Sequence, residues 1–255
     1  MKKPELDRRD FIKGAVVGGA AAAGSAIAPV DLAEAQQPAP VANTPSANPP
    51  SANTPSANTA VSGSAGYTFL DLDEAAFIEA LVDHMIPADE LTPKGSDLGI
   101  NIYIDRALAG GWGKGDRLYL QGPWKPGVAS QGYQLPLTPA QLYRAGIAAT
   151  NAHCNKAYGR SFDRLDEAQR EEVLVGLSTA KISFDSGLPV RVFWSTLYQT
   201  VMEGVFSDPI YGGNRDKAGW RMIGFPGVIA VHHDHVEKYR GKPFPNTPLG
   251  IADMS

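Results

Sequence analysis

Apolar residues recur with a helical period along most of the chain from Tyr67 onward, and no segment alternates apolar and polar residues as a half-buried strand would. The first helical segment follows the N-cap candidates Asp71 and Asp73 and ends before Pro87. Its apolar stripe consists of Phe77, Leu81, Val82, Met85 and Ile86. This pattern predicts an all-α fold, an irregular helical bundle.

Further helices are predicted from their start signals as well as from their period. They cover residues 98–108, 138–158, 167–180 and a final segment that begins at Pro189. Thr138 followed by Pro139 is an N-cap with proline at the first helical position, and Asp166 with Gln169 forms a capping box. The last helix is the most apolar, and its core positions are Val192, Phe193, Leu197, Val201 and Val205.

Two long stretches, residues 109–137 and 207–231, follow neither period and are rich in Gly, Pro and Trp. Loops of this length in a small domain are usually functional or cover something. Both stretches are therefore candidates for a binding surface.

The amino terminus has the order of a twin-arginine export signal. Arg8 and Arg9 precede an apolar run of mostly Gly and Ala over residues 14–28, which is shorter than the ~20 residues of a membrane-spanning helix. Residues 33–35, Ala-Glu-Ala, form the expected cleavage site, so residues 1–35 are predicted to be a signal peptide. The twin-arginine pathway exports folded proteins across the bacterial inner membrane, and this predicts a periplasmic protein.

Residues 36–66 consist almost entirely of Pro, Ala, Ser, Asn and Thr, with a near repeat of Ser-Ala-Asn. Such a segment buries almost no apolar surface, so a disordered linker is predicted here. The folded domain is expected to cover residues 67–255.

Charge and cysteine content exclude several classes of function. Without the signal peptide the chain has 18 basic and 22 acidic residues, so its net charge stays at −4. A mildly acidic chain without a basic stripe is a poor candidate for binding nucleic acid or anionic lipid. Because no second long apolar run follows the signal, the mature chain is expected to be soluble or held at the membrane only through a partner. Cys154 is the only cysteine, which excludes an internal disulfide, Cys-x-x-Cys-His haem attachment and cysteine-ligated clusters. Cys154 is expected to be a small buried helix residue; the alternative is an intermolecular disulfide.

The usual cofactor and catalytic motifs are missing. The sequence contains no dinucleotide fingerprint after a strand, no phosphate loop, no nucleophile elbow and no zinc-protease helix motif. His232 and His235 are the only ligand-type pair, and a helical turn would bring them together near Asp234. Two imidazoles and one carboxylate make an incomplete structural site, so a polar turn is favoured over metal binding. A stand-alone metal-binding protein remains the alternative, together with a cofactor-free ligand-binding domain.

The stretch after the last helix combines glycines, which allow close backbone approach, with aromatic residues that can anchor an interface. The predicted partner-binding residues, taken from both irregular stretches, are Trp112, Trp124, Asp208, Tyr211, Asn214, Arg215, Trp220 and Phe225. An ordered loop that covers the domain's own core is the alternative.

These features together resemble the gluconate 2-dehydrogenase subunit 3 family, over roughly Phe69 to Val231. The resemblance rests on the export signal, on the loop from Trp112 to Trp124, and above all on residues 203–227. It implies the small subunit of a gluconate 2-dehydrogenase-type complex that binds, stabilises and escorts a large flavoprotein subunit holding FAD, with a multihaem cytochrome c subunit passing electrons to quinone. It also implies periplasmic location at the inner membrane, no cofactor in this chain and no catalytic residues to assign.

Overall fold

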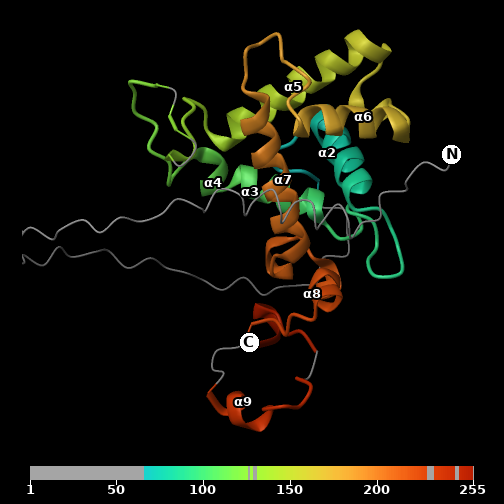
Figure 1. Ribbon diagram of the computed structural model, residues 1–255, viewed down its shortest axis with the longest axis vertical. Helices are drawn as coiled ribbons and strands as arrows, with labels where there is room; N and C mark the ends of the chain where they lie inside the picture. The colour runs from blue at the N-terminus through green and yellow to red at the C-terminus, as the bar shows by residue number, and fades with distance from the viewer. Residues whose placement is uncertain (1–65, 126, 129–130, 229–232, 245–246, 255) are drawn as a thin grey trace, which may run out of the picture. The chain divides into compact units, whose positions relative to one another are not determined.

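The computed structural model describes residues 66–125, 127–128, 131–228, 233–244 and 247–254 (Figure 1). The chain divides into two units, Met1–Thr59 and Ala60–Ser255, and every described residue belongs to the second. The predicted signal peptide and all of the predicted linker except Gly66 lie outside the described residues.

The described part of the second unit is built from helices. In chain order they are α2 (Leu72–Met85), α3 (Ile100–Ala109), α4 (Gly111–Lys114), α5 (Pro139–Tyr158), α6 (Glu167–Ser178), α7 (Val190–Phe206), α8 (Ala218–Ile223) and α9 (His233–Lys238). Short 3₁₀-helices are η2 (Phe162–Arg164), η3 (Pro209–Tyr211), η4 (Arg215–Lys217) and η5 (Ile251–Met254). The described residues contain no β-strand, only an isolated bridge between Gly227 and Leu249, so the predicted all-α class is confirmed.

Helices α2, α5 and α6 begin where their sequences predict. Each starts with a capping box, in which Asp71, Thr138 or Asp166 accepts the N3 backbone N–H and the N3 side chain accepts the cap's own N–H. Because these contacts join residues three apart, they are encoded locally and were readable in the sequence.

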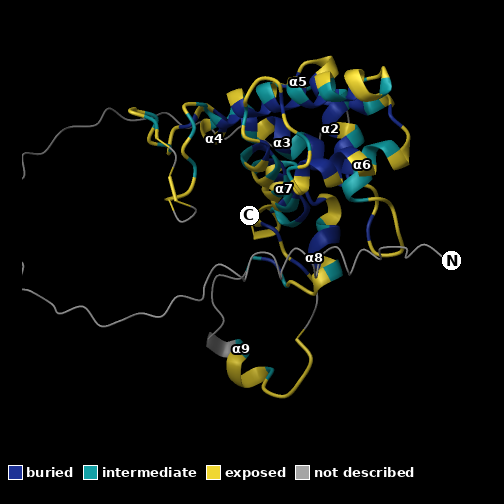
Figure 2. Cartoon of the chain, turned by 45° about the horizontal axis from the view of Figure 1, so that its top comes forward, coloured by how far each residue is buried: buried dark blue, intermediate teal, exposed yellow. Residues whose placement is uncertain are grey.

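The core lies among α2, α3, α5, α6 and α7, and Figure 2 shows their buried faces turned toward one another. Its largest fully buried side chains include Phe77, Ile104, Tyr143, Leu177 and Phe193. Burying a side chain of this size contributes roughly 1.5–3 kcal/mol, so these helices hold the unit together.

Two glycines allow α7 to approach its neighbours closely. A Cβ at Gly146 of α5 would lie 2.1 Å from the ring of Phe193, and a Cβ at Gly204 would lie 2.9 Å from Cγ2 of Ile100 on α3. Contacts this short do not occur, so both helix crossings depend on the missing side chain.

A buried carboxylate binds the backbone just before the first helix of the domain. Oδ1 of Asp105 on α3 accepts the backbone N–H of Phe69 at 2.8 Å and of Leu70 at 3.0 Å, and Oδ2 accepts that of Thr68 at 2.8 Å. Arg144 adds a second contact, because its guanidinium lies 4.5 Å from the centre of the Phe69 ring. These contacts fix residues 68–70 against α3 and α5.

Helices α4 and α8 were not predicted, since the stretches that contain them were expected to lack regular structure. Each has fewer than seven residues, which is too short for a hydrophobic period to show, and each ends at a glycine in the left-handed region, Gly115 or Gly224. None of the described helices combines the length and the apolar composition that crossing a lipid bilayer requires.

Candidate partner-binding surface

The segment after α7, residues 207–228, is called the signature loop below. Asn214, Asp216 and Lys217 have positive φ values of 47°, 56° and 58° although they are not glycines. Backbone conformations of this kind persist only where the surroundings hold them. The loop is therefore shaped by its internal contacts.

Asn214 is the centre of those contacts and is completely buried. Its Nδ2 donates to the carbonyl of Ser207 at 2.8 Å, and its Oδ1 accepts the N–H of Gly219 at 2.8 Å. The side chain thus ties the start of the loop to the first turn of α8.

Trp220 fastens α8 to the end of α7. Its indole Nε1 donates to the carbonyl of Phe206 at 2.7 Å, and its ring packs edge-on against Phe225 with the centres 5.2 Å apart. Only 4% of Trp220 is exposed. This differs from the expectation that Trp220 offers apolar area to a partner: an aromatic residue in a loop can face either way, and here Trp220 supports the loop from inside.

Asp208 was also predicted to bind a partner, but it is buried. One carboxylate oxygen accepts the N–H of Ile210 at 3.0 Å, and the other accepts the N–H of Ile251 at 2.8 Å. Asp208 therefore joins the signature loop to the C-terminal segment, residues 247–254.

Further bonds hold the C-terminal segment in the same place. Val228 donates to the carbonyl of Leu249 at 2.7 Å, and Lys217 binds the carboxylate of Asp253. The hydrogen bond from Lys217, followed by that from the Gly250 N–H, lowers the pKa of Asp253. No recognisable sequence motif predicts the contacts of Lys217 and Asp208 with this segment, because they span 36 and 43 residues.

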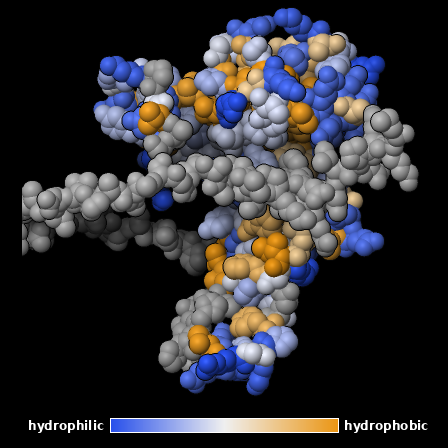
Figure 3. Space-filling view, viewed as in Figure 1, coloured by the Kyte–Doolittle hydropathy of each residue, from blue (hydrophilic) through white to orange (hydrophobic). Residues whose placement is uncertain are grey.

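Asp208, Asn214 and the indole N–H of Trp220 use their polar groups within the chain, whereas several apolar side chains of the same region are exposed. The loop and the C-terminal segment expose Ile210, Tyr211, Ile223, Phe225, Leu249, Ile251 and Met254. Figure 3 shows hydrophobic side chains gathered over the carboxyl end of α7. Of the predicted binding residues in this region, Tyr211, Arg215 and Phe225 are exposed.

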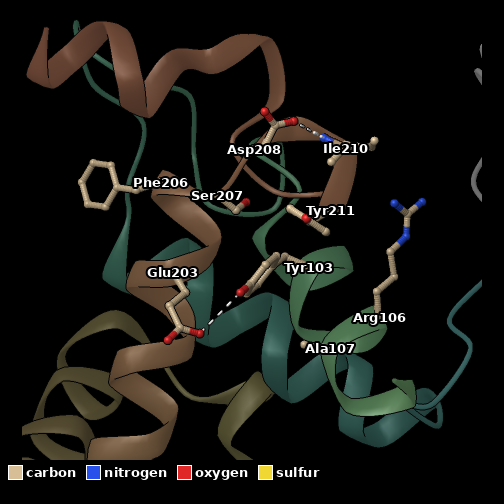
Figure 4. Close-up of a pocket in the computed structure, with 9 residues that line it drawn as sticks. All are labelled: Tyr103, Arg106, Ala107, Glu203, Phe206, Ser207, Asp208, Ile210 and Tyr211. Atoms are coloured by element: carbon tan, nitrogen blue, oxygen red, sulfur yellow. Dashed lines mark hydrogen bonds between the residues drawn. The ribbon is translucent and has the colours of Figure 1, made fainter. Parts of the chain in front are cut away.

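A pocket of about 660 Å³ opens beside these residues (Figure 4). It lies between α3, which contributes Tyr103, Arg106 and Ala107, and the segment from the end of α7 to η3. The hydroxyl of Tyr103 donates to Glu203 at 3.4 Å, and burial together with the Glu203 charge raises the pKa of Tyr103 to about 12. Tyr103 is therefore a neutral hydrogen-bond donor at physiological pH.

The other predicted half of the surface is separate. Trp112 on α4 is partly exposed and packs edge-on against Tyr143 at 6.3 Å, whereas Trp124 is half-buried. Helices α4 and α8 lie apart in both views (Figures 1 and 2). The structure therefore does not bring the loop from Trp112 to Trp124 and the signature loop together in one patch.

No group of three metal-ligating side chains occurs among the described residues. His232 lies outside them, and the ring of His235 packs edge-on against Tyr239 and Phe244, with centres 5.6 and 5.4 Å away. The hypothesis of a metal site there stays untested.

Cys154 is completely buried in α5, as expected for a structural helix residue. Burial raises the pKa of its thiol to about 11, so the thiolate is scarce at neutral pH. Cys154 is not placed to act as a nucleophile.

Comparison with known protein families gives two matches. Residues 5–25, which include Arg8 and Arg9, match the model of the TAT (twin-arginine translocation) pathway signal sequence, so the predicted export signal is confirmed. A search of the curated proteins and a search of the solved structures gave no match. Residues 72–227 match the family model of gluconate 2-dehydrogenase subunit 3, and this match covers the helical core and nearly all of the signature loop. Because it extends over more than half of the sequence, the chain belongs to the gluconate 2-dehydrogenase subunit 3 family.

Proposed function

We propose that this chain is the non-catalytic small subunit of a periplasmic gluconate 2-dehydrogenase-type complex, which oxidises D-gluconate to 2-dehydro-D-gluconate. In this proposal it binds and stabilises a large FAD-containing subunit and escorts it, folded, through the twin-arginine pathway. FAD belongs to that partner and haem c to a cytochrome subunit that passes electrons to quinone. The complex, not this chain, provides association with the inner membrane.

One observation carries the proposal: the signature loop is braced internally and holds apolar side chains out to solvent. Asn214, Asp208 and Trp220 use their polar groups within the chain, while Tyr211 and Ile223 are each 57% exposed. A preorganised loop with exposed aromatic and aliphatic residues loses little conformational freedom when a partner covers it. The family match supports the choice of partner, and the export signal supports the escort role.

Co-purification tests the binding role. The chain is expressed with its flavoprotein, and Tyr211→Asp is compared with Leu72→Asp, which introduces the same charge at a residue that is 88% exposed at the start of α2. Tyr211→Asp is expected to reduce the recovered flavoprotein at least about tenfold, because a carboxylate must then be desolvated in the interface, whereas Leu72→Asp has no effect. Normal recovery and normal gluconate oxidation with Tyr211→Asp would contradict the assignment of the surface.

Fractionation tests the escort role. Changing both Arg8 and Arg9 to Lys is expected to leave this chain and the flavoprotein in the cytoplasm, because the receptor reads the arginine pair. Normal export of the flavoprotein in that strain would reject the role. The non-catalytic assignment fails if the purified chain alone holds flavin or haem and oxidises gluconate.

A further inference from the structure

The pocket between α3 and the signature loop, called the α3–η3 socket below, has a mainly apolar lining. Ala107 and Phe206 contribute apolar surface from the helices, and Ile210 and Tyr211 contribute it from η3. Since Ile210 and Tyr211 also belong to the exposed surface of the signature loop, the socket is continuous with that surface. A partner that covers the loop also covers the socket.

Most polar groups of the socket already have partners. Asp208 accepts the N–H groups of Ile210 and Ile251, and Glu203 accepts the hydroxyl of Tyr103. They are therefore poorly available to an incoming ligand.

Arg106 is different. No hydrogen bond or ion pair joins its guanidinium to any residue that the structure describes, and it extends from α3 at the side of the socket near Tyr211 (Figure 4). Its Nη1 lies beside Gly212, where an added Cβ would come within 3.1 Å of it. An arginine fork of this kind suits a planar carboxylate, which it can bind with two parallel hydrogen bonds.

We propose that the α3–η3 socket receives one large apolar side chain of the flavoprotein partner, and that Arg106 pairs with a carboxylate close to that side chain in the partner's sequence. This inference rests on the proposed function and specifies the partner segment as acidic and apolar. The lining argues against a free sugar acid as the occupant. A polyol would place several hydroxyl groups against apolar walls without hydrogen-bond partners, which is unfavourable.

The charge is tested by reversal at a single position. Arg106→Glu is compared with Arg160→Glu, which makes the same change at an exposed arginine just after α5. Binding of the full mature chain to the purified flavoprotein is measured at low and high salt. Arg106→Glu is expected to raise the Kd at least about tenfold and Arg160→Glu to leave it unchanged, because only Arg106 loses an interfacial ion pair. Arg106→Gln is expected to make the Kd less dependent on salt than in the unaltered chain.

The apolar part is tested by filling the socket. Ala107→Trp occupies the space without changing charge, and Ala107→Ser alters the same position with little change of volume. Ala107→Trp is expected to raise the Kd at least about tenfold while Ala107→Ser binds normally, since only the larger side chain excludes the partner's residue. Thermal unfolding of each variant tests whether the domain remains folded.

The outcomes separate this inference from the proposed function. If the unaltered chain binds the flavoprotein, and Arg106→Glu and Ala107→Trp bind it equally well, the socket is not an anchor although the small-subunit role stands. If the unaltered chain does not bind the flavoprotein, both are rejected. Saturable binding of gluconate to the isolated chain that Arg106→Glu abolishes would also overturn the socket inference, because the occupant would then be the sugar acid.

Discussion

Removal of the Asp105 carboxylate is expected to destabilise the domain by releasing the chain where it enters the helices. The side chain is 2% exposed, and its two oxygens accept the N–H groups of Thr68, Phe69 and Leu70. One buried carboxylate therefore accepts three consecutive backbone N–H groups of residues 68–70. No local sequence pattern predicts this contact.

The magnitude follows from the exposure of the donors. A hydrogen bond to a charged acceptor contributes about 1.5–3 kcal/mol, and Thr68 is exposed and can bind water instead, so the bonds of Phe69 and Leu70 dominate. Asp105→Ala is therefore expected to lower the free energy of unfolding by about 3–5 kcal/mol. Asp105→Asn keeps one acceptor oxygen for Phe69 and Leu70 and should lose about 1–2 kcal/mol.

Urea denaturation of the mature chain, followed by circular dichroism, measures these differences, and Asp97→Ala at an exposed turn position is the control, with an expected effect below about 0.5 kcal/mol. Hydrogen exchange gives a second reading, because the amides of Phe69 and Leu70 should lose protection in Asp105→Ala before those of α7 do. Equal stability of Asp105→Ala and Asp97→Ala, with unchanged protection at both amides, would refute the reasoning.

Three further predictions concern the core and the loop. Gly146→Ala should lower the free energy of unfolding by about 1–2 kcal/mol in the same assay, because the clash with Phe193 outweighs the better helix propensity of alanine; a gain in stability would contradict the close packing of α5 and α7. The Cys154 thiol should resist a thiol reagent at pH 8 in the folded protein and react fully in urea, since burial raises its pKa to about 11 and its thiolate fraction grows only as the pH approaches that value; rapid labelling of the folded protein would show otherwise. Trp220→Phe should keep the contact with Phe225 but lose the hydrogen bond to Phe206, which lowers stability by about 1–2 kcal/mol; an unchanged unfolding midpoint would mean that this bond does not hold α8.

The sequence predicted what short-range chemistry determines. The caps at Asp71, Thr138 and Asp166 act over three residues, and the stripe of each long helix repeats within a few turns. Both kinds of signal can be recognised without knowledge of the tertiary structure. The helix bounds were consequently predicted to within about two residues.

The candidate binding surface was harder to predict, because the exposure of its residues depends on contacts between distant segments. The segment from Asp208 was predicted to bind a partner, yet sequence alone does not say whether Trp220 faces the core or a partner. The contact of Asp208 with Ile251 spans 43 residues and has no motif. Arg106 was missed because it is one ordinary arginine on a helix, and only the packing of η3 beside α3 makes it the edge of a pocket.

The bonds between the C-terminal segment and the signature loop have a practical consequence for the design of fusion proteins. A purification tag or reporter joined directly after Met254 would emerge close to Asp253, which is held by Lys217, and next to the exposed Ile251. Such an addition would crowd the face proposed for the flavoprotein, so a tag at this point is expected to impair assembly even though the helical core folds normally. An insertion at Gly187, which has open space around its α-carbon and precedes α7 at its far end, is the better place for a label.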